Sequence, residues 1–175
     1  MPEIKQNPMR DIFIRKVVLN IGVGDAGEKL LKAQKVLGIL TGDRKSIQTI
    51  SKTTNKDLGI RLGMPIGVKV TLRGSEAENM IKRALWVRNN RLPFYCFDKS
   101  GNFSFGVPDY TTFEGQKYDP DIGIFGLDIN VVLERKGYRV SRRKERRSKI
   151  AYHHRIESAE AQEFAKNKFN IEVVQ

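Results

Sequence analysis

Three glycines, at positions 22, 24 and 27, have the G-x-G-x-x-G spacing with which many proteins bind the phosphates of a dinucleotide. That use also requires an acidic residue at the end of the next strand, about twenty positions further on. Asp43 lies near that distance, but it precedes the strand expected from Ser46 to Ile50. We therefore expect no nicotinamide or flavin cofactor, although a nucleotide-dependent enzyme is the competing hypothesis. The glycines are interpreted as a tight strand-to-helix turn whose amide groups meet a phosphate.

A dense run of cations extends from Arg139 to Arg155. Charge of this density destabilises a free surface, so we expect the run to become ordered against RNA. The residues of this run that we expect to bind RNA are Arg142, Arg143, Arg146, Arg147, Lys149, His154 and Arg155. A DNA-binding basic helix is the alternative, although no heptad repeat follows to form a zipper.

Neither the histidines nor the single cysteine predicts a reactive centre. His153 and His154 are adjacent, so they cannot face the same way on a regular element, and no third metal ligand accompanies them. Cys96 lies beside Phe94, Tyr95 and Phe97, which is typical of a packed thiol. We expect no metal site, no disulfide and no cysteine nucleophile.

Two expected strands carry polar residues on one face. In residues 12–21, Lys16 and Asn20 alternate with apolar positions, and in residues 65–73 Lys69, Thr71 and Arg73 do so. If helices cover the apolar faces, these polar side chains form one outer surface. Lysine and arginine neutralise phosphates, while Asn and Thr bond to ribose hydroxyls and base edges. An ordinary solvated face is the alternative.

Between these strands, residues 51–64 form an unusually long polar loop. Loops of this kind often carry function, so we expect this one to contact a partner; a disordered connection is the alternative. Its candidate contact residues are Lys52, Thr53, Thr54, Asn55, Lys56 and Arg61.

Helices and further strands complete the pattern. Apolar spacing predicts helices over residues 28–40, from Ser75 onward with a capping box to Glu78, and over residues 158–168. The segments expected to form strands are 12–21, 45–50, 65–73 and 127–135, with at most short strands in 98–126 and a short strand or tail at 171–174. Phe103 and Phe105 are expected in the core.

These elements predict one α+β domain over residues 1–175. We expect a mainly antiparallel sheet with helices packed on one face, an N-terminal arm at residues 1–11 and a basic C-terminal extension at residues 139–155.

Composition restricts the class of partner. The chain has 175 residues, 32 Lys and Arg against 20 Asp and Glu, a net charge of +12 and a pI of about 9.9. Such an excess of positive charge is typical of proteins that bind a polyanion. The apolar runs are too short to span a membrane, and the N-terminus has no signal-peptide core. We expect a cytoplasmic RNA-binding structural protein with no small-molecule substrate, not an enzyme; a basic DNA-associated protein is a third hypothesis.

Taken together, the residues resemble the universal large-subunit ribosomal protein family numbered five in bacteria and archaea and eleven in eukaryotes. The ordered matches are Asn7–Arg10, Leu19–Gly24, Leu40–Gly42, Gly59–Arg61, Pro65–Gly67, Val70–Gly74, Gly101–Phe103, Tyr118–Pro120 and Gly126–Ile129. Leu133–Arg139, the basic run and His154–Ile156 resemble the archaeal or eukaryotic form, the archaeal form most closely.

The resemblance implies partners that spacing alone does not. The family binds 5S rRNA and large-subunit rRNA in the central protuberance beside neighbouring large-subunit proteins, reaches P-site tRNA with its long loop and meets a small-subunit protein at an intersubunit bridge. Asn20 and Thr71 would then contact 5S rRNA, and residues 51–64 would be the P-site loop. The chain has Asp43 where the family often has Gln, and Ser51-Lys-Thr-Thr where relatives carry Ala-Arg or Ala-Lys. The remaining residues expected to bind RNA are Arg10 and Lys45.

Overall fold

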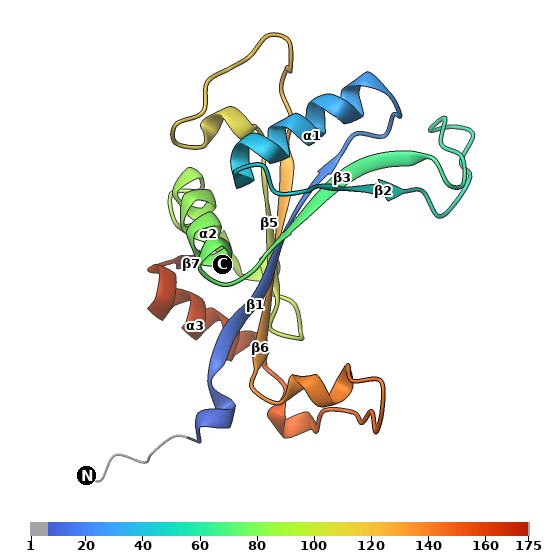
Figure 1. The fold of residues 1–175 in the computed structure, drawn as a ribbon. Coiled ribbons are helices and arrows are strands. Elements are labelled where there is room, and N and C mark those ends of the chain that lie inside the picture. The colour runs from blue at the N-terminus through green and yellow to red at the C-terminus, as the bar shows by residue number, and fades with distance from the viewer. Residues whose placement is uncertain (1–6, 175) are drawn as a thin grey trace.

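The fold is organised around β1, an eleven-residue strand from Ile12 to Gly22 at the centre of a five-stranded sheet (Figure 1). The computed structural model describes residues 7–174. The sheet has the order β2-β3-β1-β6-β5, and all its neighbours run antiparallel. Its other strands are β2 (Ile47–Ile50), β3 (Pro65–Leu72), β5 (Phe103–Val107) and β6 (Leu127–Arg135).

Three helices cover one face of this sheet, as expected: α1 (Glu28–Thr41), α2 (Ser75–Val87) and α3 (Ser158–Phe169). Alternate side chains of β1 point toward the helices and are buried there. Helix α1 packs against β3, and α2 packs against β1. Phe103 and Phe105 lie in the same core, which confirms the expectation for both. Among residues 7–174, no helix is long and apolar enough to cross a membrane.

The helix ends show which capping signals operate. Gly42 ends α1 in the left-handed conformation (φ 66°) and its amide donates to the Gly38 carbonyl, as a C-cap glycine should. The capping box predicted at Ser75 is wrong, because Gly74 is the N-cap of α2 and Ser75 is already helical. A capping box begins α3, where the Glu157 and Glu160 side chains each accept a hydrogen bond from the other residue's backbone amide.

We expect Glu157→Ala to lower the free energy of unfolding by about 1 kcal/mol, because it leaves an N-terminal amide of α3 without its acceptor. Chemical denaturation of both forms measures this loss. Glu163→Ala, an exposed change in the middle of the same helix, is the control and should change stability by less than half as much. Equal losses in the two variants would contradict a capping role for Glu157.

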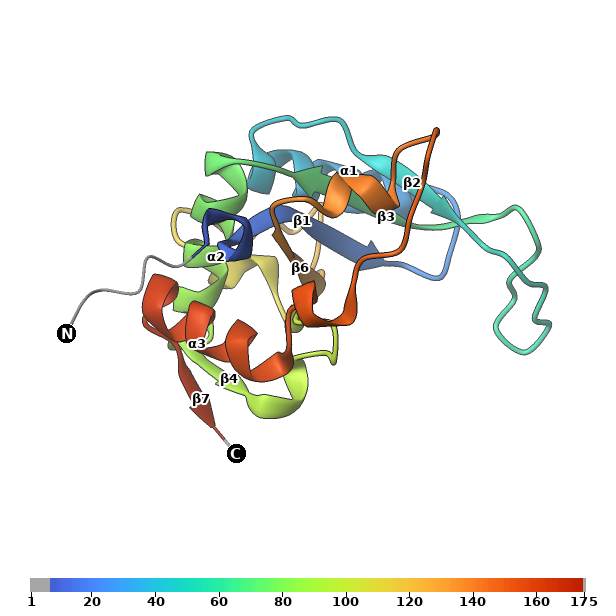
Figure 2. The ribbon, with the colours of Figure 1, turned by 90° about the horizontal axis from the view of Figure 1, so that it is seen from below.

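A second, two-stranded sheet was not predicted from the sequence. β4 (Arg91–Pro93) pairs in parallel with β7 (Glu172–Val174), and the two lie side by side in Figure 2. An ion pair of 3.0 Å joins Arg91 Nε to Glu172 Oε2 across the pair. The end of the described chain is therefore held by strand pairing and an ion pair against the segment that follows α2.

Residues 51–64 form an ordered hairpin that continues β2 and β3 away from the body of the protein (Figure 2). The Ser51 amide donates to the Met64 carbonyl at 2.8 Å, and Asn55 and Ile60 exchange backbone hydrogen bonds of 2.8 and 2.9 Å. A turn closed at Gly59 (φ 66°) reverses the chain. The alternative of a disordered connection is thus not what the structure shows.

The basic residues 139–155 do not form a C-terminal extension, which corrects the expectation. They form a loop between β6 and α3 that contains the short 3-10 helices Tyr138–Ser141 and Tyr152–His154. We call residues 138–155 the basic segment. The arm expected at residues 1–11 is described from residue 7 onward and contains a 3-10 helix at Pro8–Arg10; its earlier residues lie outside the described range.

Candidate nucleic-acid interface

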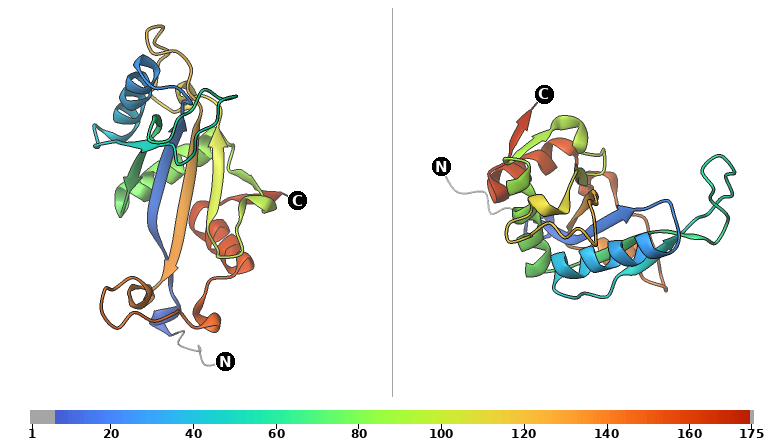
Figure 3. Two further views of the ribbon diagram at one scale, coloured as in Figure 1. Left: turned by 90° about the vertical axis from the view of Figure 1, so that its right-hand side faces the viewer. Right: turned by 90° about the horizontal axis from the view of Figure 1, so that it is seen from above.

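The polar residues predicted on the outer surface alternate with the buried residues of β1 and β3, so they point away from α2. In Figure 3 (left) the strands lie in front of that helix. Asn20 of β1 pairs directly with Lys69 of β3, and Val18 pairs with Thr71. Lys69 and Thr71 are exposed, whereas Asn20 is half-buried between neighbouring strands. We call this surface the open face. It presents a lysine, an amide and a hydroxyl within two adjacent rows, a donor set suited to phosphate, ribose and base edges.

β6 and β5 extend the open face with groups that were not predicted. Asp128 pairs with Asn20, Asn130 pairs with Val18, and Ser104 of β5 pairs with Asn130. The alternation of β6, in which Leu127, Ile129 and Val131 are buried, indicates that the residues between them point to the open face. Only the strand register, which the sequence does not reveal, places Asp128 and Asn130 beside the predicted residues.

A β-bulge in β1 brings one further cation to the end of the open face that lies next to the basic segment. Ile14 pairs with Leu133 and Lys16 with Val132, so Arg15 is an extra residue in β1. Its Nε lies 3.7 Å from Glu134 Oε2. Arg15 was not among the predicted RNA-binding residues, because a bulge breaks the alternation on which that prediction depends.

Glu134, near the end of β6, binds the basic segment through an ion pair with Arg142. Its carboxylate is almost buried and accepts a hydrogen bond from Arg142, whose pKa is raised above its ordinary value by that bond. Arg142 was predicted to bind RNA, and the structure also gives it this anchoring contact. His154 Nε2 lies 2.8 Å from the Lys136 carbonyl, which fixes the other end of the segment. The other predicted cations of the segment are exposed: Arg143, Arg146, Arg147, Lys149 and Arg155.

The glycine turn between β1 and α1 does not belong to a dinucleotide-binding fold. Such a fold needs parallel strands on either side of the helix, whereas β2, which follows α1, lies at the sheet edge beside antiparallel β3. The Gly24 amide donates to the Ile66 carbonyl at 2.9 Å. An RNA contact at Gly24 therefore stays a prediction, but its amide is already used; Gly22 is the exposed last residue of β1.

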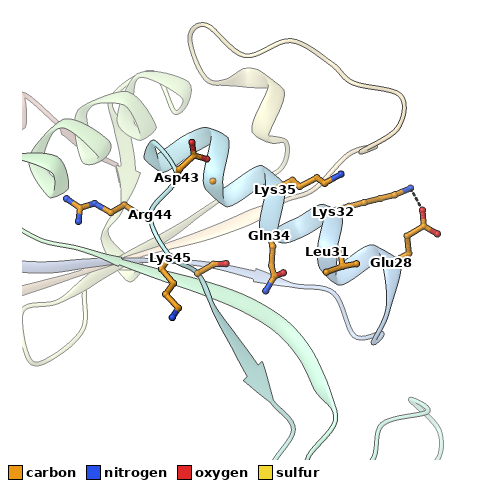
Figure 4. Close-up of a pocket in the computed structure, with 10 residues that line it drawn as sticks. Glu28, Leu31, Lys32, Gln34, Lys35, Asp43, Arg44 and Lys45 are labelled. Atoms are coloured by element: carbon orange, nitrogen blue, oxygen red, sulfur yellow. Dashed lines mark ion pairs between the residues drawn. The ribbon is translucent and has the colours of Figure 1, made fainter.

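Lys45 lies apart from the open face, in a groove of about 590 Å³ between α1 and residues 43–46 (Figure 4). Lys32 and Lys35 of α1 also line this groove, and Lys32 pairs with Glu28 at 3.4 Å. Asp43 lies in the same groove and is held at φ 59°. Its charge offsets part of the positive charge there.

A smaller hollow of about 300 Å³ brings Thr71 and Arg73 together with Arg44. Arg44 forms an ion pair with Glu76 in the first turn of α2, so part of the positive charge at this edge is neutralised. Arg73 follows the end of β3 and is exposed. The predicted residues Thr71 and Arg73 thus share one surface, as the alternation of β3 indicated.

Burial raises the pKa of the Cys96 thiol, and the positive charge of Arg88 partly opposes this effect. A thiol with a raised pKa is a poor nucleophile at neutral pH. Within residues 7–174, no group of three or more His, Cys, Asp or Glu side chains is placed to hold a metal ion.

Comparison with known proteins agrees with this geometry. Residues 7–61 match the family model described as Ribosomal protein L5, and residues 65–168 match the model that describes the C-terminus of the same ribosomal family. A large ribosomal subunit protein uL5 from Thermoplasma volcanium is 52% identical over 96% of this chain and 99% of its own length. Proteins of the same name from Picrophilus torridus and Methanoregula boonei are 46% and 47% identical, over 99% and 94% of this chain and 99% of their own lengths.

These relatives are archaeal, in agreement with the type predicted from the basic run. The matches cover nearly the whole described chain and exclude the hypothesis of a nucleotide-dependent enzyme. The chain belongs to the ribosomal protein L5 family, and is therefore a structural constituent of the large ribosomal subunit.

Proposed function

We propose that the open face binds 5S rRNA, that the hairpin at residues 51–64 contacts P-site tRNA and that the basic segment binds large-subunit rRNA. The observation that carries the proposal is the place of the polar side chains of β1 and β3. They lie on the one sheet face that the helices leave uncovered, between the hairpin at one end and the basic segment at the other (Figure 1).

The chemistry of the open face supports 5S rRNA as its partner. Asn20 and Thr71 occupy the positions that the family resemblance assigns to 5S contacts, and Lys69 lies directly across from Asn20. The sheet is antiparallel, so one face can meet a partner while the other holds the core. Asp128 is the acidic neighbour in this row, and a phosphate is therefore expected nearer to Lys69 than to β6.

The shape of the hairpin supports a contact at a distance from the body of the protein. Lys52, Lys56 and Arg61 are exposed along it, and Leu58 and Leu62 near its tip are 66% and 68% exposed. Exposed leucines beside cations suit a partner that offers both an apolar surface and phosphates, as the folded elbow of a tRNA does. Contact with a small-subunit protein at an intersubunit bridge is part of the proposal and rests on the family resemblance alone.

The proposal is tested by titrating the full chain with 5S rRNA, with a random RNA of equal length and with duplex DNA, at several salt concentrations. We expect 5S rRNA to bind best, with log K falling against log salt by about 0.7 to 0.9 per phosphate contact. Equal affinity for 5S rRNA and the random RNA would reject the 5S assignment. Preference for duplex DNA would favour the DNA-associated protein instead.

Replacing residues 53–62 by a two-residue Asn-Gly turn should leave 5S rRNA affinity within about twofold of the original, because the hairpin projects beyond the open face. Ribosomes that carry this shortened chain should bind P-site tRNA more weakly, by about three- to tenfold, which corresponds to one or two lost contacts. Filter binding of labelled tRNA to purified ribosomes measures the effect. Unchanged tRNA affinity would remove the hairpin from the proposal and leave the 5S assignment standing.

A further inference from the structure

A hollow of about 700 Å³ lies between the basic segment and the end of the sheet. Val132 and Asn102 belong to the sheet side of this hollow, and Tyr138, Ile150 and Tyr152 belong to the basic segment. Its remaining lining residues include Lys99, Lys149, Arg155, Glu134 and Glu157. A volume of this size fits one nucleotide, and it is far too small for a duplex.

The charge inside the hollow favours an anion in spite of its two carboxylates. Glu134 is neutralised by Arg142 and Arg15, and Glu157 accepts a backbone amide of α3 through its capping box. Within residues 7–174, neither Lys149 nor Arg155 forms an ion pair, and Arg155 uses one of its donors on the Ile150 carbonyl at 3.4 Å. Two cations thus remain to face a phosphate.

The other lining groups suit a nucleobase. Tyr152 is 77% exposed, so its ring is accessible for stacking, and Val132 and Ile150 add apolar surface. The Asn102 Oδ1 atom accepts the Leu133 amide at 3.3 Å, which holds this side chain and leaves its two N–H donors for a ligand. A site for phosphate alone would not need an accessible ring, an apolar wall and a fixed amide.

We infer that this hollow takes one unpaired nucleotide extruded from the bound RNA, with its base beside Tyr152 and its phosphate beside Lys149 and Arg155. The inference rests on the proposed function, since it assumes that RNA lies along the basic segment. A base inside a helix cannot enter a concave site, so the nucleotide comes from a bulge, a loop or a strand end. Val132 follows Asn130 on the same face of β6, which makes the hollow continuous with the open face.

The test is NMR titration of the full chain, labelled at its methyl groups, with 5′-AMP, 5′-UMP, ribose 5-phosphate and inorganic phosphate in turn. We expect both nucleotides to shift the Val132 and Ile150 methyl signals saturably, with at least fivefold lower Kd than ribose 5-phosphate. The Leu58 methyls at the hairpin tip report non-specific binding and should stay unchanged. No saturable shift, or equal responses to nucleotides and inorganic phosphate, would overturn the inference.

Tyr152 supplies the matched variants because its exposed side chain is not needed for the fold. Tyr152→Ala should raise the Kd for 5′-AMP at least fivefold, while Tyr152→Phe keeps the ring and should change it less than twofold. Tyr118→Ala, at another exposed tyrosine, is the control and should leave the Kd unchanged. A 5S rRNA titration of the same samples separates the outcomes: intact 5S binding with no nucleotide response sinks the extruded-nucleotide site alone.

Discussion

The double variant Lys69→Glu, Arg73→Glu should bind 5S rRNA about a hundredfold more weakly than the original chain at physiological salt. Each hydrogen bond between a charged side chain and a phosphate contributes about 1.5–3 kcal/mol, and two lost contacts together correspond to a hundredfold change or more. Both residues are exposed, so the substitutions should not alter the fold. Fluorescence anisotropy with labelled 5S rRNA measures the affinity.

The control for this experiment makes the same change of charge on the helix side of the protein. Lys82 of α2 and Lys166 of α3 are exposed there, and Lys82→Glu, Lys166→Glu should weaken binding by less than tenfold through long-range repulsion alone. The open-face variant should also lower the salt slope by about 0.7 to 0.9 per lost contact, or about 1.4 to 1.8 in all. If the two double variants lose equal affinity, net charge and not the open face governs binding.

Glu134→Gln should weaken binding to the mixed RNAs of the large subunit by about tenfold, although it removes a negative charge from an RNA-binding surface. The carboxylate holds Arg142 and Arg15 in place, and without it these two guanidinium groups repel each other and the basic segment detaches from β6. Loss of one or two positioned contacts corresponds to this change in affinity. Filter binding measures it, and limited proteolysis should show faster cleavage between residues 139 and 150.

Asp128→Asn is the matched control, because Asp128 lies on the same strand and the same face as Glu134. Its side chain is exposed, so removal of its charge should leave the basic segment in place and raise RNA affinity up to threefold by reducing repulsion. The two substitutions make the same change from carboxylate to amide and are expected to act in opposite directions. An increase in affinity for Glu134→Gln would show that Glu134 acts as a simple repulsive charge.

Local patterns were sufficient to predict most of the main sheet and all three helices. β1, β3 and β6 alternate strictly over most of their length, because one face is buried under helices and the other is open. Gly42 marked the end of α1 correctly, since a left-handed C-cap is a strong local signal. The capping box predicted at Ser75 was wrong because Ser75 is the first residue of α2 and not its N-cap. The sequence alone does not fix which residue caps a helix.

Features that depend on distant partners could not be predicted. The β4–β7 pair joins Arg91 to Glu172, and the local sequence of either strand contains no sign of the other. The same is true of the contact between Arg142 and Glu134 and of the bulge at Arg15. For the open face, alternation identified Asn20, Lys69 and Thr71 one strand at a time, whereas their adjacency follows from a register set by the whole sheet.

The backbone hydrogen bonds of the hairpin set how far it reaches from the sheet. Its two arms are joined by backbone hydrogen bonds at Ser51–Met64 and Asn55–Ile60, and a turn at residues 61–64, with Gly63 at φ 82°, lies between its second arm and β3. The hydrogen bonds between the arms hold Lys56 at a set distance from the strand that carries Lys69. A partner at the tip and a partner on the sheet would therefore lie at a defined spacing from each other.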